Sequence, residues 1–230
     1  MYTVKIKDKI YTFEEKKTLE QIANELNIKC YVAKVNNRLR ELTFYLNFDC
    51  VVEFLDLNET EAVRVYQTTL RYIIAMALKR IDNNAVLTFN DYVSRTFIGL
   101  LENTKTNFNQ KYLNELKKEI DFIINENFPI IRYQKEKEEV LKLYKQIGYE
   151  DKYNVLQYRE DNKVNFYNCD GYIDYMYGYM LPSTGYIKNY AIKLHHPGFV
   201  VQYPRAEFGG SIPPFENEFT YGQTLKRAAN

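Results

Sequence analysis

The sequence predicts an α+β protein made of two successive units, and three observations lead to this fold class. Short runs of alternating apolar and polar residues, typical of half-buried strands, occur within the first 57 residues and again after residue 155. Between them, apolar residues recur at helical spacing over long stretches. All six prolines and eight of the nine glycines lie at position 129 or later, which places most turns in the second half.

The first unit, residues 1–57, has the element order of a β-grasp fold. Thr18 and Gln21 have the spacing of a capping box, in which each side chain bonds the backbone N–H of the other residue, so a helix is expected to start there. Asn36 and Asn37 tolerate positive φ and suit the turn of a hairpin. The expected elements are a hairpin over residues 3–13, a helix over 18–27, a strand pair over 31–42 and a strand over 50–57.

The second unit, residues 58–205, is expected to place long helices over one side of an antiparallel sheet. The apolar spacing of residues 61–81 predicts one helix, and a second helix is expected to stop before Pro129, because the residue before a proline disfavours helical geometry. The other expected elements are a hairpin over 85–100, helices over 111–128 and 135–151, and four short strands between 163 and 204. Residues 206–230 read as a linker.

The composition excludes several classes of protein. Lys and Arg total 31 and Asp and Glu 30, and the net charge of +1 gives no overall attraction to nucleic acid or an acidic membrane. No apolar run approaches the roughly 20 residues of a membrane span, and the alternating start is not a signal peptide. Cys30, Cys50 and Cys169 stand far apart, as expected of reduced core cysteines in a cytoplasmic protein. His195 and His196, adjacent on a strand, would point to opposite faces, which favours a structural role over metal binding.

Both units resemble known domains. The first is similar to a TGS domain on the segments VAKVNNRLREL and CVVEFLDL, although TGS turns usually read Asn-Gly where this chain has Asn36-Asn37. The second resembles the editing domain that threonyl-tRNA synthetase shares with alanyl-tRNA synthetases. The resemblance is carried by the helix YQTTLRYIIAMALKRI, the turn GYEDKYNVL and the segment YIDYMYGYMLP. It spans nearly the whole chain, with the segments in the family's order.

The synthetase resemblance also indicates where a site would lie. The family's editing site uses a His-x-x-x-His helix and a Cys-x-x-x-His strand, and residues four apart share one face. None of those four residues is retained here, and the thioether of methionine cannot act as a general base. The resemblance therefore implies no catalytic residue and no metal site. The four replaced positions and two retained ones are the candidates for a ligand-binding pocket: Thr68, Tyr72, Met176, Met180, Lys152 and Asp174.

A bacterial protein group is similar over further segments. Its members join a TGS domain, an editing-like domain with similarly degenerate residues and a C-terminal uridine kinase-type domain, and they share GYEDK, YREDN, PSTGY, PGFVVQYPR and PPFE. The chain has no Gly-x-x-x-x-Gly-Lys-[Ser/Thr] loop that would hold the phosphates of ATP. This resemblance implies the N-terminal, non-catalytic region of a uridine kinase-like protein, in which ATP and magnesium serve only a kinase domain after residue 230.

Two acidic positions permit more than one interpretation. Asp170 and Asp174 have a spacing that suits a carboxylate pair, but Asp170-Gly171 is a turn signature and favours a turn followed by one pocket aspartate. Lys152 and Asp174 either form a structural ion pair or bind the hydroxyl and phosphate groups of a ligand.

Aromatic and basic residues leave further alternatives open. Tyrosines of the stretch YIDYMYGYMLPSTGY either stack a nucleic-acid base or pack as core with their hydroxyls at the rim. They are Tyr175, Tyr177, Tyr179 and Tyr186. Basic residues of the first unit either touch RNA phosphates or form a solvated face, and the even charge balance favours the solvated face. They are Lys34, Arg38 and Arg40.

These observations support two functions of different classes. The first is a regulatory or ligand-sensing region of a nucleoside kinase, with a nucleoside, nucleotide or amino acid as ligand and the kinase domain as partner in cis. The alternative is a tRNA- or RNA-binding, or inactive editing, module related to threonyl-tRNA synthetase. A basic groove leading to the tyrosine-rich stretch would favour the alternative, and an enclosed uncharged pocket would favour the first. A third interpretation is a homodimerisation scaffold. No membrane partner is expected.

Overall fold

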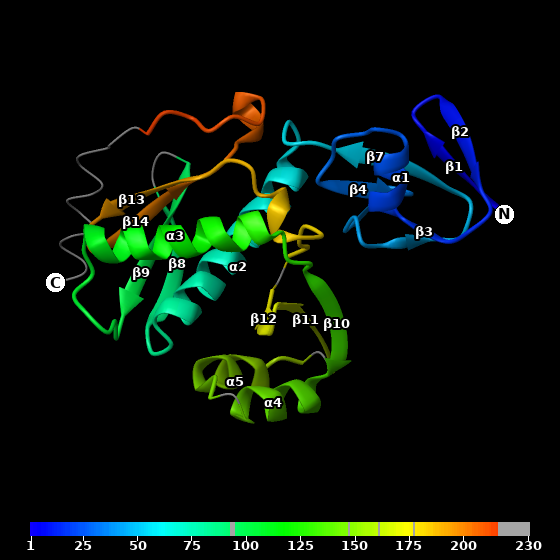
Figure 1. The fold of residues 1–230 in the computed structure, drawn as a ribbon. Helices are drawn as coiled ribbons and strands as arrows, with labels where there is room; N and C mark the ends of the chain where they lie inside the picture. The colour runs from blue at the N-terminus through cyan, green and yellow to red at the C-terminus, as the bar shows by residue number, and fades with distance from the viewer. Residues whose placement is uncertain (93–94, 147, 161, 177, 216–230) are drawn as a thin grey trace.

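The structure is a computed structural model, and it describes residues 1–92, 95–146, 148–160, 162–176 and 178–215. The first 57 residues form a unit at one end of the molecule, built on a five-stranded sheet with the order β2-β1-β7-β4-β5 (Figure 1). Strands β1 and β7 are parallel and the other pairs are antiparallel. The elements are β1 (Tyr2–Ile6), β2 (Lys9–Phe13), β3 (Lys17–Thr18), α1 (Leu19–Glu25), β4 (Val32–Val35), β5 (Arg38–Arg40), β6 (Tyr45–Leu46) and β7 (Cys50–Leu55).

Local sequence signals explain the turns and the helix start of this unit. Thr18 is the N-cap of α1; its Oγ1 accepts the backbone N–H of Gln21 at 3.1 Å, while Gln21 Oε1 accepts the backbone N–H of Thr18 at 2.8 Å. Asn36 and Asn37 have φ values of 47° and 64° in the turn between β4 and β5. The predicted hairpins and the predicted capping box are therefore confirmed.

Two long helices form the centre of the remaining chain. The first, α2 (Thr60–Ile81), is one uninterrupted helix, as predicted, and its buried side chains belong to the largest apolar cluster. The second, α3 (Gln110–Glu126), begins at Asn109, whose side chain accepts two backbone N–H groups of the first turn at 2.9 and 3.1 Å. It ends at Asn127, which has a φ of 53°, before the proline as predicted. The two helices pack against each other (Figure 1).

The strands after residue 85 form two sheets, whereas the sequence predicted one. Their orders are β13-β14-β9-β8 and β10-β11-β12. The expected strand over 172–179 instead ends at Tyr175, and further along the chain two backbone donors bond side chains: Met180 N–H bonds Glu41 and Leu181 N–H bonds Thr69. The elements are β8 (Val86–Tyr92), β9 (Thr96–Glu102), β11 (Lys163–Cys169), β12 (Tyr172–Tyr175), the short helix η1 (Thr184–Tyr186), β13 (Ala191–His195) and β14 (Gly198–Gln202).

The predicted helix over 135–151 is instead divided among three elements. The first residues belong to the strand β10 (Ile131–Glu136), which pairs with β11, and they are followed by α4 (Lys137–Gln146) and α5 (Glu150–Gln157). Gly148, with a φ of 77°, lies between the two helices as the expected helix terminator. Every residue of β10 is exposed, so neither face of this strand is buried, and the short alternation Ile131-Arg132-Tyr133-Gln134 is followed by charged residues that favoured a helix.

Three apolar clusters make up the core, and the largest joins α2 and α3 to the four-stranded sheet. Within the described ranges, no helix combines the length and the apolar character that a membrane crossing needs. The start of the expected linker contains the short helix η2 (Ala206–Phe208), and Gln202 Nε2 donates to the carbonyl of Pro213 at 2.9 Å, so this part lies against β14. The linker from residue 216 onward falls outside the described residues.

Candidate functional site

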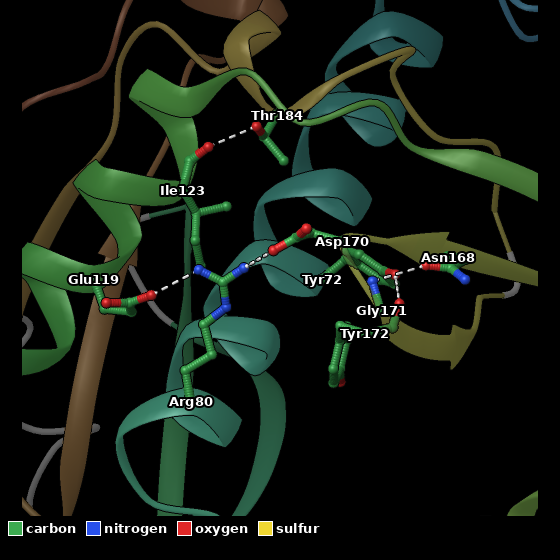
Figure 2. A network of polar contacts seen from close by, with 9 residues as sticks. All are labelled: Tyr72, Arg80, Glu119, Ile123, Asn168, Asp170, Gly171, Tyr172 and Thr184. Atoms are coloured by element: carbon green, nitrogen blue, oxygen red, sulfur yellow. Dashed lines mark hydrogen bonds and ion pairs between the residues drawn. The ribbon is translucent and has the colours of Figure 1, made fainter.

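Tyr72 lies at the centre of the predicted pocket and is almost completely buried, with 1% of its surface exposed. Its hydroxyl is 2.7 Å from the carbonyl oxygen of Tyr172 and 3.2 Å from that of Tyr167 (Figure 2 shows Tyr72 against Tyr172). The rings of Tyr72 and Tyr172 meet edge to face with 5.1 Å between centroids. Burial, and then the nearby charge of Asp174, raise the pKa of Tyr72 well above its usual value. The hydroxyl therefore stays protonated and fastens β11 and β12 to α2.

Three residues of the 176–181 segment, Gly178, Met180 and Leu181, lie against the side chains of Thr68 and Thr69 on α2. Thr68 is next to Gly178, since a Cβ added to that glycine would lie 3.2 Å from Thr68 Oγ1. The hydroxyl that holds the segment, however, belongs to the next residue: Thr69 Oγ1 accepts Leu181 N–H at 2.9 Å and lies 3.8 Å from Met180 Sδ. Met180 is 2% exposed, and the half-buried Met176 packs against the same apolar cluster.

Lys152 and Asp174 form an ion pair, with 2.7 Å between Lys152 Nζ and Asp174 Oδ2. The same carboxylate accepts the hydroxyl of Tyr172 at 2.9 Å and the backbone N–H of Tyr175 at 2.7 Å. The ammonium also lies 4.7 Å from the centroid of the Tyr149 ring. Both residues thus have partners within the chain, and they connect through Tyr172 to the buried tyrosine of α2.

Glu41 is part of this site and was missed by the sequence reasoning. It follows β5 in the first unit, is 5% exposed, and accepts the backbone N–H of Met180 at 2.9 Å and the hydroxyl of Tyr167. Arg132 Nη1 lies 3.8 Å from its other carboxylate oxygen. Burial and the negative charge of Glu41 raise the pKa of Tyr167. No local pattern marks this glutamate, because its partners lie about a hundred residues further along the chain.

Two guanidinium groups meet at the half-buried ring of Tyr179. Arg132 Cζ, from β10, lies 5.4 Å from the ring centroid. Arg40 Nη1, from β5, lies 3.4 Å from the Tyr179 hydroxyl, and its guanidinium carbon lies 5.1 Å from the Phe44 ring. The first unit, through Arg40, and the second unit, through Arg132, therefore each supply a cation beside the segment that carries Met176 and Met180.

The other tyrosines and basic residues have different surroundings. Tyr186 donates to Glu20 at 2.7 Å, and burial followed by that hydrogen bond raises its pKa. The ring of Tyr175 lies 5.0 Å from the guanidinium of Arg159. Lys34 pairs with Glu61 at 3.1 Å, Arg38 is exposed at the start of β5, and Tyr177 lies outside the described residues.

Asp170 belongs to a separate polar network. It has a φ of 46° and, with Gly171, forms the predicted turn between β11 and β12. Its carboxylate bonds Arg80 at 2.7 Å, and the same arginine bonds Glu119 at 2.9 Å (Figure 2). Asp170 thus joins β11 to α2 and α3, while Asp174 bonds Lys152, and the predicted turn at Asp170-Gly171 is confirmed.

Among the imidazole and thiol groups, Cys169 lies beside this site, because it pairs with Tyr172 across β11 and β12 and acts on the pKa of Tyr72. His195 ends β13 and His196 follows in the turn to β14. No three His, Cys, Asp or Glu residues in the described part of the chain are grouped as metal ligands would be. All three cysteines are buried, and burial raises the pKa of Cys30 and of Cys169 to about 12. Two clefts, of about 340 and 500 Å³, open elsewhere on the surface, and the six candidate residues line neither of them.

Comparison with known proteins connects this site to one class of enzyme. The chain is 30% identical over 197 residues to threonine–tRNA ligase of Thermotoga maritima, which covers 82% of this chain and 30% of that enzyme. The same enzyme from Natranaerobius thermophilus is 31% identical over 177 residues, and that from Clostridium tetani is 30% identical over 175 residues; each match covers 76% of this chain. No family model matches the chain.

The chain is therefore homologous to part of threonyl-tRNA synthetase. It spans less than a third of the length of the relatives that it matches.

Proposed function

We propose that the chain is a tRNA-binding module related to the N-terminal region of threonyl-tRNA synthetase, without editing activity. In this proposal residues 1–57 are a TGS domain of β-grasp fold, and residues 58–205 are a degenerate editing-like domain. The sheet order β2-β1-β7-β4-β5, with α1 packed on it, supports the first assignment. The homology that extends over 82% of the chain supports the second.

The observation that carries the proposal is the pair of guanidinium groups at Tyr179. Arginine beside a half-buried tyrosine suits a nucleotide, because the ring can stack on a base while the guanidinium bonds a phosphate. Arg40 and Arg132 come from the two proposed domains, so an RNA bound there would touch both. The basic groups lie beside the segment that corresponds to the editing site, which is the arrangement expected of an RNA end that reaches this segment.

The loss of editing follows from the chemistry of the replaced residues. Hydrolysis of an aminoacyl ester needs a group that orients and deprotonates water. The phenol of Tyr72 is buried and protonated, Thr68 Oγ1 donates to a carbonyl of its own helix at 2.9 Å, and Met176 and Met180 are thioethers that bind no proton at neutral pH. Lys152 and Asp174 neutralise each other. The partly exposed residues among the six, Thr68, Lys152 and Met176, are proposed to contact the end of the RNA, while the buried Tyr72, Asp174 and Met180 support them from inside.

The proposal is tested by fluorescence anisotropy of an RNA hairpin that copies the acceptor stem of threonine tRNA and ends in CCA. Tyr179→Leu keeps an apolar side chain but removes the ring, and a loss of about 1–3 kcal/mol of binding free energy is expected from the missing stack. Arg40→Gln should lower the slope of log affinity against log salt by about 1. Lys9→Gln, on the exposed hairpin of the first unit, is the matched control. Unchanged affinity in both test variants would reject this surface.

A second candidate is the N-terminal regulatory region of a uridine kinase-like protein, in which residues 206–230 lead to the kinase domain. The segments GYEDK, PSTGY and PPFE favour it, as does the replacement of the editing residues, which frees the domain for another ligand. A thermal-shift screen with uridine, nucleotides and amino acids tests this reading. Stabilisation by uridine or its phosphates, in the absence of RNA binding, would favour it over the tRNA module. Size-exclusion chromatography tests the remaining alternative, a homodimer.

A further inference from the structure

A cleft of about 340 Å³ lies beside the first half of α2, and none of the six candidate residues lines it. Its walls are α2, the β8–β9 hairpin and the turn that follows β14. Most of the side chains that line it are polar or charged, among them Arg64, Gln67, Asp91, Arg95, Arg205 and Glu207. The volume is within the range of small-molecule sites.

Two of the arginines are held in place by aromatic rings. Arg205 Nη1 donates to the Tyr203 hydroxyl at 2.6 Å, and Arg205 Cζ lies 5.3 Å from the centroid of the same ring. Arg95 Cζ lies 5.2 Å from the ring of Phe208. A planar guanidinium that is already fixed loses little conformational freedom when it bonds an oxyanion. Hydrogen bonds from arginine guanidinium groups are a common means by which proteins recognise phosphate.

A carboxylate of the chain itself lies between these two arginines. Glu207 Oε1 is 3.2 Å from Arg95 Nε and 3.2 Å from Arg205 Nη2. A hydrogen bond from its own backbone N–H, and then the two arginines, hold the pKa of Glu207 below its usual value. The carboxylate of Glu207 therefore already occupies the guanidinium N–H donors that a phosphate would use.

The charge of the cleft favours an anion. Asp91 is neutralised by Arg71, whose Nη2 lies 2.7 Å from Asp91 Oδ1, and Glu207 is shared by two arginines. The guanidinium of Arg64 adds a further positive charge from α2. Because the arginines outnumber the carboxylates, the single negative charge of a bound phosphodiester would reduce the positive charge of the cleft.

We infer that this cleft binds a phosphate group through Arg64, Arg95 and Arg205, and that Glu207 competes with the phosphate for Arg95 and Arg205. The phosphate group belongs to the backbone of a bound RNA, and this choice of ligand rests on the proposed function. Arg64 is one helical turn, about 6 Å, from Thr68, so an RNA held here lies close to the 176–181 segment. A nucleoside monophosphate or free phosphate would use the same donors.

The test measures binding of a fluorescent single-stranded RNA that ends in CCA, by anisotropy, and of uridine monophosphate and inorganic phosphate, by calorimetry. Arg205→Gln is expected to weaken RNA binding roughly tenfold, because it removes charge-assisted hydrogen bonds. Glu207→Gln is expected to tighten binding several-fold, since it removes the competing carboxylate and its charge. A misfolded variant cannot produce this tightening. Lys9→Gln is again the control.

The outcomes separate the cleft from the proposed function. Opposite effects of Arg205→Gln and Glu207→Gln on RNA affinity support both the phosphate-binding cleft and the proposed RNA-binding function. The same opposite effects on uridine monophosphate or inorganic phosphate, with no RNA binding, support the cleft and reject the RNA module. RNA that binds equally well to both variants overturns the cleft and leaves the RNA module intact. If the RNA, uridine monophosphate and inorganic phosphate all fail to bind, both the phosphate-binding cleft and the RNA-binding function are overturned.

Discussion

Glu41 connects the first unit to the 176–181 segment, and its replacement should destabilise the protein more than any exposed glutamate. The side chain is 5% exposed and accepts the backbone N–H of Met180 at 2.9 Å and the hydroxyl of Tyr167. Glu41→Ala removes the oxygen that accepts both hydrogen bonds and leaves the backbone N–H of Met180 inside the protein without this partner. Glu41→Gln retains one carbonyl oxygen for the same donors and removes only the charge.

The size of the effect can be worked out from these contacts. A hydrogen bond to a charged group contributes about 1.5–3 kcal/mol. The Tyr167 hydroxyl is also 3.3 Å from the carbonyl of Gly178, so it regains part of its bonding after the substitution. We therefore expect Glu41→Ala to lower the free energy of unfolding by about 3 kcal/mol. For Glu41→Gln we expect about 1 kcal/mol, because one acceptor remains while the pairing with Arg132 is lost.

Urea unfolding followed by circular dichroism and by tyrosine fluorescence measures both values. The two probes should give the same transition if the units unfold together through this contact. Glu14→Ala, at an exposed position of the first unit, is the matched control and should stay within about 0.5 kcal/mol of the unchanged protein. If Glu41→Ala also stays within that range, the buried carboxylate does not hold the two parts together and the reasoning fails.

Three further predictions follow from the site. Tyr72→Phe removes the hydroxyl that lies 2.7 and 3.2 Å from two backbone carbonyls, and it should lower the stability by about 1–3 kcal/mol in urea; no change would mean that water replaces the hydroxyl. Asp174→Asn should lower the melting temperature more than Lys152→Gln does, because the aspartate also accepts a tyrosine hydroxyl and a backbone N–H, while the lysine side chain is 29% exposed. A larger decrease for Lys152→Gln would contradict this explanation. Burial raises the pKa of Cys30 and of Cys169 from 9.0 to about 12, so only the thiols of the unfolded chain ionise near pH 9. The free energy of unfolding should therefore fall from about pH 9 upward, and the decrease should be smaller in a variant that carries both Cys30→Ala and Cys169→Ala.

Features set by neighbouring residues could be predicted from the sequence. The capping box at Thr18, the turn at Asn36-Asn37 and the single helix α2 each depend on residues within one or two turns of each other. The turn at Asp170-Gly171 belongs to the same class. In these cases the local preference and the tertiary structure agree, so the pattern was sufficient.

Features set by distant contacts could not be predicted in this way. Strand β10 is exposed along its whole length, and it pairs with β11, which lies about 30 residues further along the chain. Glu41 and Thr69 bond the backbone of Met180 and Leu181, and neither partner is near in sequence. The resemblance to the synthetase placed Thr68 opposite that segment, but it could not show that the next residue, Thr69, whose side chain points about 100° away around the helix axis, supplies the bonding hydroxyl.

The most direct test of the central claim measures binding and hydrolysis of seryl-tRNA for threonine in the same experiment. The account predicts micromolar, salt-dependent binding that is weakened by Tyr179→Leu, together with loss of the serine no faster than in buffer. Hydrolysis above the buffer rate that is abolished by Tyr72→Phe would show that the replaced residues still support editing. Absence of binding at low salt would show that the homology to threonyl-tRNA synthetase is not accompanied by recognition of RNA.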